Sequence, residues 1–279
     1  MEEIWGLLHT GHQDAAINMA LDEALIKWHS NGDIPPVLRF YGWSKPTLSV
    51  GRFQKVEKSI NFATIEQNDC QFVRRLTGGS AVLHDDELTY SIVVSEDKPY
   101  IAESVLEAYY TLSKGIMAGF KILNIPVESF LHEERKKKER TEVCFERASD
   151  YEMLVDGKKL SGHAQTRVQG VLMQHGSLPF TMDTELLFNL FNYPSDRVRD
   201  RQRKGFYEKA ITMNEASENN ITYEQAAKAF EEGFKQALNL KFEDLELTAE
   251  QWKEVEALAE NKYRSKEWNM NRNRKKVQS

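Results

Sequence analysis

The stretch that decides the fold is Val73-Arg74-Arg75-Leu76-Thr77-Gly78-Gly79-Ser80-Ala81-Val82-Leu83-His84-Asp85. It places a basic pair, a glycine turn and a short apolar strand close together. Glycine has no Cβ, so the backbone at Gly78 and Gly79 can approach a ligand closely. An arginine beside such a turn can hold a carboxylate or a phosphate through its guanidinium group. On these residues alone, the stretch is either a tight turn between two strands or the wall of a binding site.

The composition of the whole chain is that of a globular protein with a substantial core. The chain has 279 residues, of which 41% are hydrophobic and 29% are charged. We expect a single domain over residues 1–270 and a basic C-terminal tail over residues 271–279. The formal charge of −6 gives no support for a protein that binds nucleic acid.

The cysteines and the apolar segments indicate the cellular setting. Cys70 and Cys144 are too few for a disulfide framework, and a cytosolic chain would keep both reduced. The N-terminus lacks the basic and apolar regions of a signal peptide, and no apolar run approaches the length of about 18 residues that indicates a membrane span. We therefore expect a cytoplasmic protein that does not cross a membrane, and a monomer.

Hydrophobic periodicity predicts strands mainly in the first two thirds of the chain and helices mainly in the last third. The predicted strands cover residues 37–41, 47–51, 88–94, 151–155, 158–162 and 171–178. The predicted helices cover residues 18–28, 59–68, 101–123, 222–238 and 248–263. The sum is an α+β domain with a mixed or antiparallel sheet flanked by helices.

Local signals sharpen three of these boundaries. Asp156-Gly157 predicts a tight hairpin between the two strands that flank it. Thr248 and Gln251 have the spacing of a capping box at the start of a helix. Residues 130–145 have no hydrophobic periodicity, so we expect a loop there.

Lys159, in the segment Gly157-Lys158-Lys159-Leu160-Ser161-Gly162-His163, is the first candidate for a catalytic side chain. The simpler interpretation is an exposed lysine on a hairpin. A lysine at a strand edge beside a glycine can also point inward at a bound carbonyl group. There it would stabilise the negative charge that develops during acyl transfer.

Cys144 is the second candidate. A free cysteine is commonly a small buried hydrophobic residue. Cys144, however, ends a polar loop and precedes a strand, and Arg147 is close to it in sequence. Cationic neighbours lower the pKa of a thiol and increase the fraction of reactive thiolate. Cys70 has no such setting, and we expect it to be packed between a helix and a strand.

These segments together resemble the biotin/lipoate protein ligase and octanoyltransferase superfamily. The glycine-rich stretch matches the RRxxGGxxVxHD signature of that superfamily, and Lys159 falls on the lysine of its (R/K)K(V/I/L)(S/A)G segment. The resemblance implies the catalytic-domain fold of the biotin/lipoate protein ligases. It also implies an acyl pocket whose substrate-binding residues are Arg75, Gly78, Gly79, His84, Ser161, Gly162, His175 and Gly176. Ser80 replaces the third glycine of the pattern, and His163 stands where relatives usually carry serine.

The segment Val143-Cys144-Phe145, followed by Tyr151-Glu152 and Lys159, resembles the cysteine-dependent octanoyltransferases of Gram-positive bacteria. The resemblance implies transfer of an octanoyl group from octanoyl-acyl carrier protein, through a thioester on Cys144, to a lipoyl-domain lysine such as that of the glycine cleavage H protein. It implies no metal and no other cofactor. Ala148–Asp150 departs from the proline and tryptophan usual after the cysteine.

Two alternatives remain open at this point. The first is an ATP-dependent lipoate-protein ligase, in which Arg74, Arg75 and the glycines could cradle a phosphate. The second is a non-catalytic protein that binds an acyl group or a carrier. The presence of Cys144, and the end of the sequence soon after Trp268-Asn269 where larger ligases add an accessory domain, favour the transferase. Retention of both Lys159 and Cys144 argues against a non-catalytic role.

Overall fold

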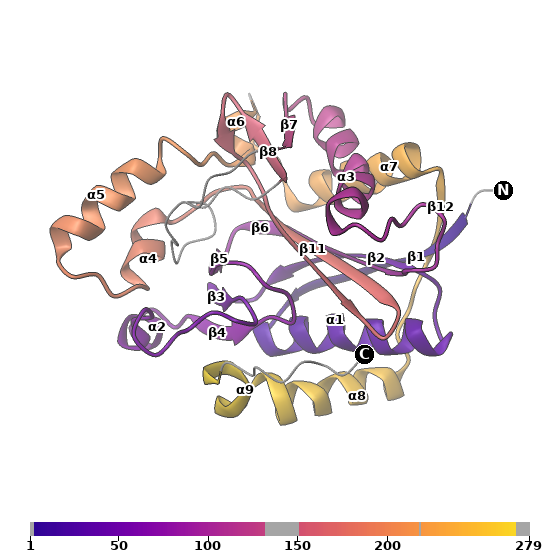
Figure 1. Ribbon diagram of the computed structural model, residues 1–279, viewed down its shortest axis with the longest axis horizontal. Helices are drawn as coiled ribbons and strands as arrows, with labels where there is room; N and C mark the ends of the chain where they lie inside the picture. The colour runs from indigo at the N-terminus through magenta and orange to yellow at the C-terminus, as the bar shows by residue number, and fades with distance from the viewer. Residues whose placement is uncertain (1–2, 132–150, 218, 272–279) are drawn as a thin grey trace.

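The computed structural model describes residues 3–131, 151–217 and 219–271 (Figure 1). The loop predicted over residues 130–145 lies almost entirely outside these ranges, and so do Cys144, Ala148–Asp150 and residues 272–279 of the predicted tail. Within the described ranges, no helix combines the length and the apolar character needed to cross a bilayer.

A six-stranded mixed sheet forms the centre of the described structure, with the strand order β10-β11-β6-β2-β1-β12. β1 pairs in parallel with β2 and with β12, and the remaining neighbours pair antiparallel. The bounds of these strands are β1 (Glu3–Gln13), β2 (Val37–Trp43), β6 (Glu87–Ser95), β10 (Gly162–Val168), β11 (Val171–Pro179) and β12 (Leu240–Asp244). The prediction of an α+β fold with a mixed sheet flanked by helices is confirmed.

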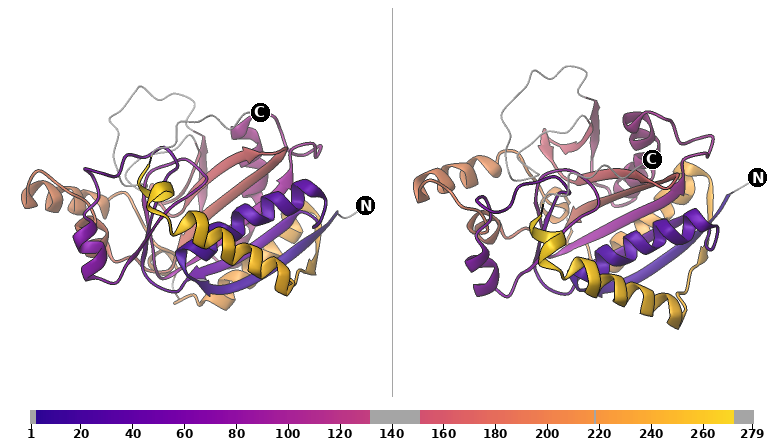
Figure 2. Two further views of the ribbon diagram at one scale, coloured as in Figure 1. Left: turned by 90° about the horizontal axis from the view of Figure 1, so that it is seen from below. Right: turned by 60° about the horizontal axis from the view of Figure 1, so that its bottom comes forward.

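Helices cover both faces of this sheet, with α3 and α7 on one face and α1, backed by α8, on the other (Figures 1 and 2). β2 shows how the sequence arranges this, because successive side chains of a strand point to opposite faces. Leu38 and Phe40 pack into the core with α3 and α7, whereas Val37 and Tyr41 pack into the core with α1. A strand buried on both faces is therefore apolar along most of its length, and the one charged residue of β2, Arg39, is paired with Asp22.

The helices of the described ranges are α1 (Ala15–Asn31), α2 (Phe62–Gln67), α3 (Val105–Ile122), α4 (Thr184–Asn189), α5 (Asp196–Phe206), α6 (Met213–Ala216), α7 (Tyr223–Leu238), α8 (Ala249–Leu258), the π-helical turn η2 (Ala259–Tyr263) and α9 (Lys266–Met270). Side-chain caps fix several helix starts, since the first backbone N–H groups of a helix have no partner within it. Asp14 accepts hydrogen bonds from the backbone of Ala16 and Ile17 at the start of α1. The capping box of Thr248 and Gln251 is confirmed at the start of α8.

Two smaller sheets hold the segments that the sequence singles out. One has the order β4-β3-β5, with β3 (Thr47–Val50), β4 (Gln71–Arg74) and β5 (Val82–His84), and it carries the glycine-rich loop. The other has the order β7-β8-β9, with β7 (Glu128–Leu131), β8 (Tyr151–Val155) and β9 (Lys158–Lys159), and it carries Lys159. The predicted hairpin is confirmed, and Asp156 and Gly157 both have the positive φ that its tight turn requires.

No bounds were predicted for the strands β1, β7, β10 and β12 or for the helices α4, α5, α6 and α9, and most of their sequences show why. β1 interrupts its apolar run with Gly6 and a polar C-terminal half, and β10 and β12 are short and largely polar. α4 and α6 have six and four residues, too short to show a helical period. α5 has almost no apolar residues apart from Val198 and Phe206. The predicted helix over residues 101–123 begins later, at Val105, because Ser104 caps it.

Candidate functional site

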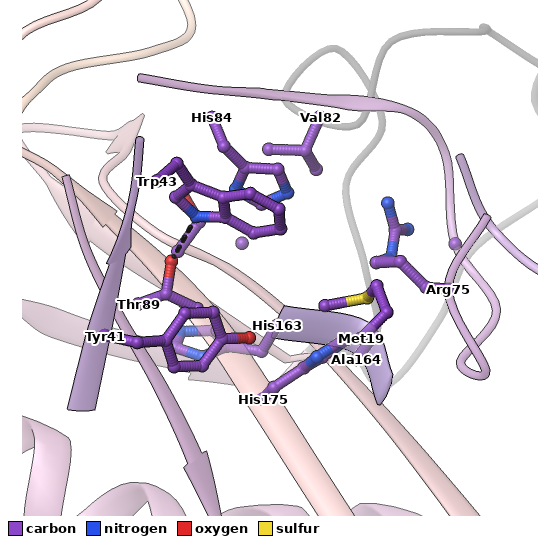
Figure 3. A pocket seen from close by; sticks show the side chains of 14 residues that line it. Met19, Tyr41, Trp43, Arg75, Val82, His84, Thr89, His163, Ala164 and His175 are labelled. Carbon is purple, nitrogen blue, oxygen red and sulfur yellow. Dashed lines mark hydrogen bonds between the residues drawn. The ribbon is translucent and has the colours of Figure 1, made fainter. Parts of the chain in front are cut away.

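A pocket lies between the glycine-rich loop and the neighbouring ends of β2, β6, β10 and β11 (Figure 3). It encloses about 410 Å³ of space, including its open mouth. The residues that line it are Met19, Tyr41, Trp43, Arg75, Gly79, Val82, His84, Thr89, Gly162, His163, Ala164, His175, Gly176 and Ser177. A mainly apolar hollow with a few convergent polar groups is the usual form of a small-molecule site.

Two buried carboxylates anchor the polar side chains of this pocket, and the first is Asp22 of α1. Arg39 donates a hydrogen bond to Asp22 at 2.8 Å, and the Tyr41 hydroxyl donates another at 3.2 Å. His175 Nδ1 lies 3.5 Å from the same carboxylate, and His175 Nε2 lies 2.8 Å from Thr77 Oγ1. Burial opposes ionisation of Asp22, but the charge of Arg39 and the contact with His175 hold the pKa of Asp22 below its ordinary value. Asp22 therefore fixes the orientation of the His175 ring from behind.

The second anchor is Glu87, at the start of β6. Its carboxylate lies 2.9 Å from His84 Nδ1 and accepts hydrogen bonds from Ser177 Oγ at 2.6 Å and from Thr89 Oγ1. Burial raises the pKa of Glu87, but the interaction with His84 and these hydrogen bonds bring it below its ordinary value. Trp43 Nε1 donates to Thr89 Oγ1 at 2.8 Å, and the Trp43 ring stacks on His84 with ring centroids 4.1 Å apart (Figure 3). Glu87 thus positions an aromatic wall of the pocket.

The two arginines of the opening stretch have different roles in the structure. Arg75 lines the pocket, and its Nη2 donates to the carbonyl oxygens of Gly78 and Ser80 at 3.2 and 3.0 Å. Arg74 points elsewhere and donates to backbone carbonyls, including that of Asn269 at 2.9 Å. Only Arg75 of the basic pair is therefore placed to meet a ligand in this pocket.

Ser49 links Arg75 to the anchor Glu87. Ser49 Oγ accepts a hydrogen bond from Arg75 Nη1 at 2.6 Å and lies 2.6 Å from His84 Nε2. An arginine can only donate, so the Ser49 proton is available for His84 Nε2, and His84 Nδ1 can donate to Glu87. This order gives every polar group a suitable partner along the hydrogen-bonded series of Arg75, Ser49, His84 and Glu87. This hydrogen-bonded series holds the Arg75 guanidinium in one orientation at the pocket wall.

We expect Ser49→Ala to loosen Arg75 and to lower stability. The substitution removes the acceptor of Arg75 Nη1 and the partner of His84 Nε2 inside a buried site, which should lower the free energy of unfolding by about 1–3 kcal/mol. Urea denaturation measures this loss, and steady-state kinetics should show a several-fold higher KM for the substrate that the pocket binds. The matched control is Ser95→Ala, which removes a serine–histidine contact of 3.1 Å to His29 away from the pocket. An unchanged KM in Ser49→Ala would contradict the role of this hydrogen-bonded series in positioning Arg75.

Gly176 is required by the side chain that crosses it. A Cβ on Gly176 would lie 2.3 Å from His163 Nδ1 and 2.5 Å from Tyr90 Cε1. His163 Nδ1 lies 2.9 Å from the Tyr90 hydroxyl, and His163 Nε2 lies 2.6 Å from Ser161 Oγ. Burial and the nearby charge of Lys159 lower the pKa of His163 to about 3, so the ring is neutral at physiological pH. Gly176 and Ser161 therefore accommodate the histidine by which this chain differs from the serine of the resembling family.

Lys159 is buried, with 5% of its surface exposed, so it is not the solvated hairpin lysine of the simpler interpretation. Its backbone is held from two sides, by the β8–β9 hairpin and by the segment after α5. Lys159 N–H donates to the carbonyl of Lys209 at 2.7 Å, and the N–H of Ile211 donates to the carbonyl of Lys159 at 3.0 Å. Its charge contributes to the lowered pKa of His163, which lines the pocket. The structure thus places the lysine close to the pocket on a fixed strand.

The structure brings most of the predicted site residues to one place. Arg75, Gly79, His84, Gly162, His175 and Gly176 line the pocket. Gly78 and Ser161 do not line it; the Gly78 carbonyl instead accepts from Arg75, and Ser161 contacts His163. Cys144 lies outside the described residues. A position at the pocket does not test the catalytic or binding role that was predicted for each residue, so these roles stay predictions.

Several lining residues were not singled out from the sequence. They are Met19, Tyr41, Trp43, Val82, Thr89, Ala164 and Ser177. Most are apolar or small residues on buried strands and a buried helix, which look the same in sequence whether they face a core or a pocket. The two buried carboxylates could have been suspected from the sequence. Glu87 follows His84 by three residues, and Asp22 stands on the otherwise apolar side of α1.

The chain is similar to known proteins over most of its length. The model of the lipoyl protein ligase A/B catalytic domain matches residues 14–235. The chain is 51% identical to octanoyltransferase LipM of Oceanobacillus iheyensis, covering 94% of this chain and 96% of that protein. It is 48% identical to octanoyltransferase LipM of Bacillus subtilis, covering 97% and 99% of the two chains.

Solved structures with the same fold come from lipoate ligases. One is an archaeal lipoylation system from Thermoplasma acidophilum, a bi-partite lipoate protein ligase and its E2 lipoyl domain, with a TM-score of 0.81 at 25% identity over 99% of both chains. Another is a lipoate-protein ligase A bound with ATP, with a TM-score of 0.76 at 23% identity over 97% of this chain and 99% of that one. The second likeness concerns the fold alone.

Proposed function

The chain belongs to the lipoyl protein ligase A/B catalytic domain family, and on that premise we propose that it transfers an octanoyl group from acyl carrier protein to a lipoyl-domain lysine through a thioester on Cys144. It is an acyltransferase of protein lipoylation. The observation that carries the proposal is the contrast in identity. Octanoyltransferases match nearly the whole chain at 51% and 48%, whereas the ligase structures match it at 25% and 23%.

The lining of the pocket supports an acyl substrate. Met19, Trp43 and Val82 offer apolar surface, and burying a chain of eight carbons there gains about 0.8 kcal/mol for each CH₂ group. Arg75 and His84 supply polar groups at the same wall and are held by Ser49 and Glu87. An apolar slot with a few oriented donors suits an acyl chain that ends in a thioester carbonyl.

In the first step, the Cys144 thiolate attacks the carbonyl carbon of the octanoyl thioester. A carbon–sulfur bond to Cys144 forms, the bond to the carrier's pantetheine sulfur breaks, and that thiolate leaves and takes a proton. The ammonium group of Lys159 faces the carbonyl oxygen and stabilises the oxyanion of the tetrahedral intermediate. The buried, hydrogen-bonded backbone of Lys159 supports this role, because a preorganised charge needs no rearrangement during the reaction.

In the second step, the neutral amine of the lipoyl-domain lysine attacks the same carbonyl carbon. A carbon–nitrogen bond forms, the bond to Cys144 breaks, and the amine proton passes to the departing thiolate or to water. The acyl group leaves as an amide, and neither step consumes ATP or needs a metal. We propose glycine cleavage H protein as the acceptor, a cytoplasmic site of action, and a monomeric enzyme.

One assay distinguishes this function from the ATP-dependent ligase. Purified enzyme is incubated with H protein and either octanoyl-acyl carrier protein without ATP or free octanoate with ATP and Mg²⁺. We expect an octanoylated H protein from the thioester alone. Modification that requires octanoate and ATP would assign the ligase reaction instead, and binding of both donors without any product would indicate a non-catalytic protein.

A further inference from the structure

Helix α5 carries a straight row of positive charges on its exposed side. Its sequence, Asp-Arg-Val-Arg-Asp-Arg-Gln-Arg-Lys-Gly-Phe over Asp196–Phe206, holds five cations and two acids in a chain whose formal charge is −6. Arg197, Arg201 and Lys204 are all exposed. Their spacing of four and then three residues places them on one face of the helix, over about 10 Å along its axis.

The two acids of α5 are already engaged by its other cations. Arg199 lies 3.2 Å from the carboxylate of Asp196 and 3.3 Å from that of Asp200, and Arg203 reaches Asp200 and Glu185 of α4. Within the part of the chain that the structure describes, no carboxylate forms an ion pair with Arg197, Arg201 or Lys204. Among the described residues, the row is therefore a net positive surface.

A short segment of the chain connects α5 to the backbone of Lys159, the candidate catalytic lysine. The C-terminal Phe206 of α5 is buried against Phe188 of α4, with ring centroids 5.5 Å apart. The chain then turns, and the backbone of Lys209 and Ile211 forms hydrogen bonds of 2.7 and 3.0 Å with the backbone of Lys159. Figure 1 shows α5 projecting from the same end of the molecule as the small sheet that carries the glycine-rich loop. A partner bound on α5 would therefore lie at the end of the molecule that carries the glycine-rich loop and the Lys159 segment.

We propose that Arg197, Arg201 and Lys204 form the docking surface for the acidic carrier protein that donates the acyl thioester, and that they contact an acidic helix of that carrier. The proposal rests on the proposed function, since it names the donor's contact with the same enzyme. A straight row with one cation per helical turn is complementary to carboxylates spaced by one turn on a facing helix.

The positive row contrasts with the negative net charge of the chain. An acidic carrier is repelled at long range by an enzyme whose net charge is negative, so a local positive surface is needed to orient their encounter. Exposed cations of this kind act mainly on association and on salt dependence. Their loss should therefore affect capture of the carrier and leave the chemistry at Lys159 unchanged.

The test is the triple variant Arg197→Glu, Arg201→Glu and Lys204→Glu in the full chain. The measurement is the rate of acyl-enzyme formation, with octanoyl-acyl carrier protein or with octanoyl-pantetheine, which has the same thioester without the protein. We expect KM for octanoyl-acyl carrier protein to rise at least tenfold and to lose its salt dependence, while the kinetics with octanoyl-pantetheine stay the same. The matched control reverses three exposed lysines on other helices, Lys121, Lys228 and Lys253.

Each outcome decides the proposal. An unchanged KM for octanoyl-acyl carrier protein, or an equal rise in the control variant, would overturn it. A defect confined to the second half-reaction, measured as transfer from pre-acylated enzyme to H protein, would also overturn it by assigning the row to the acceptor. Equal loss with octanoyl-pantetheine would overturn it as well, because the effect would then not depend on the carrier protein. If the wild-type enzyme forms no acyl-enzyme with either donor, the proposed function fails, and that result is distinct from failure of the docking surface.

Discussion

Cys144→Ala should reduce octanoyl transfer from acyl carrier protein to H protein by at least about a thousandfold, because the variant has no group on which the acyl chain can be held. What remains should be direct attack of the acceptor amine on a bound thioester. The measurement is the initial rate of H-protein octanoylation, followed by intact mass. Since Cys144 lies outside the described residues, this prediction depends on its sequence setting and on the family likeness.

The control for this experiment is the second cysteine. Cys70 is half-buried, and burial, with the nearby charge of Asp85 and Asp69, raises the pKa of its thiol. A raised pKa lowers the thiolate fraction, so Cys70→Ala should keep full activity. Full activity in Cys144→Ala, or its loss in Cys70→Ala, would contradict the assignment of the nucleophile.

Lys159→Met should lower kcat by about 100- to 1,000-fold, because removal of one preorganised oxyanion donor costs about 3–4 kcal/mol of transition-state stabilisation. Methionine keeps most of the length of the side chain and removes the charge. We expect kcat and kcat/KM to fall together, since the interaction is made in the transition state. The measurement is single-turnover acylation of the enzyme by octanoyl-acyl carrier protein.

Lys158→Met is the matched control for Lys159→Met. Lys158 is its neighbour in β9, where alternate side chains point to opposite faces, and it is less buried than Lys159. We expect wild-type rates from Lys158→Met. A rise in KM alone for Lys159→Met would assign the lysine to ground-state binding, contrary to the proposed role.

The parts of the fold that could be predicted are those set by local chemistry. The turn at Asp156-Gly157 and the cap at Thr248 depend on residues within a few positions, and both are confirmed. The pairing of β1 with β12 depends on residues far apart in sequence, such as Glu3 opposite Leu240. No local pattern specifies such a pairing, because its stability comes from packing and hydrogen bonds that exist only in the folded chain.

The same distinction applies to the candidate site. Arg75 and His84 belong to one short motif, so the sequence could point to both, and both line the pocket. Trp43 faces the pocket from a strand that is buried along its whole length, and nothing in its sequence separates it from the core residues beside it. The different roles of Arg74 and Arg75 also required the structure, since adjacent residues of an extended segment point in opposite directions.

The most direct test of the central claim is the intact mass of the wild-type enzyme after incubation with octanoyl-acyl carrier protein in the absence of ATP. We predict an adduct of one octanoyl group that maps to the peptide containing Cys144, is removed by hydroxylamine, and transfers to H protein when that protein is added. An enzyme that stays unmodified while H protein is octanoylated at the wild-type rate would contradict the thioester on Cys144.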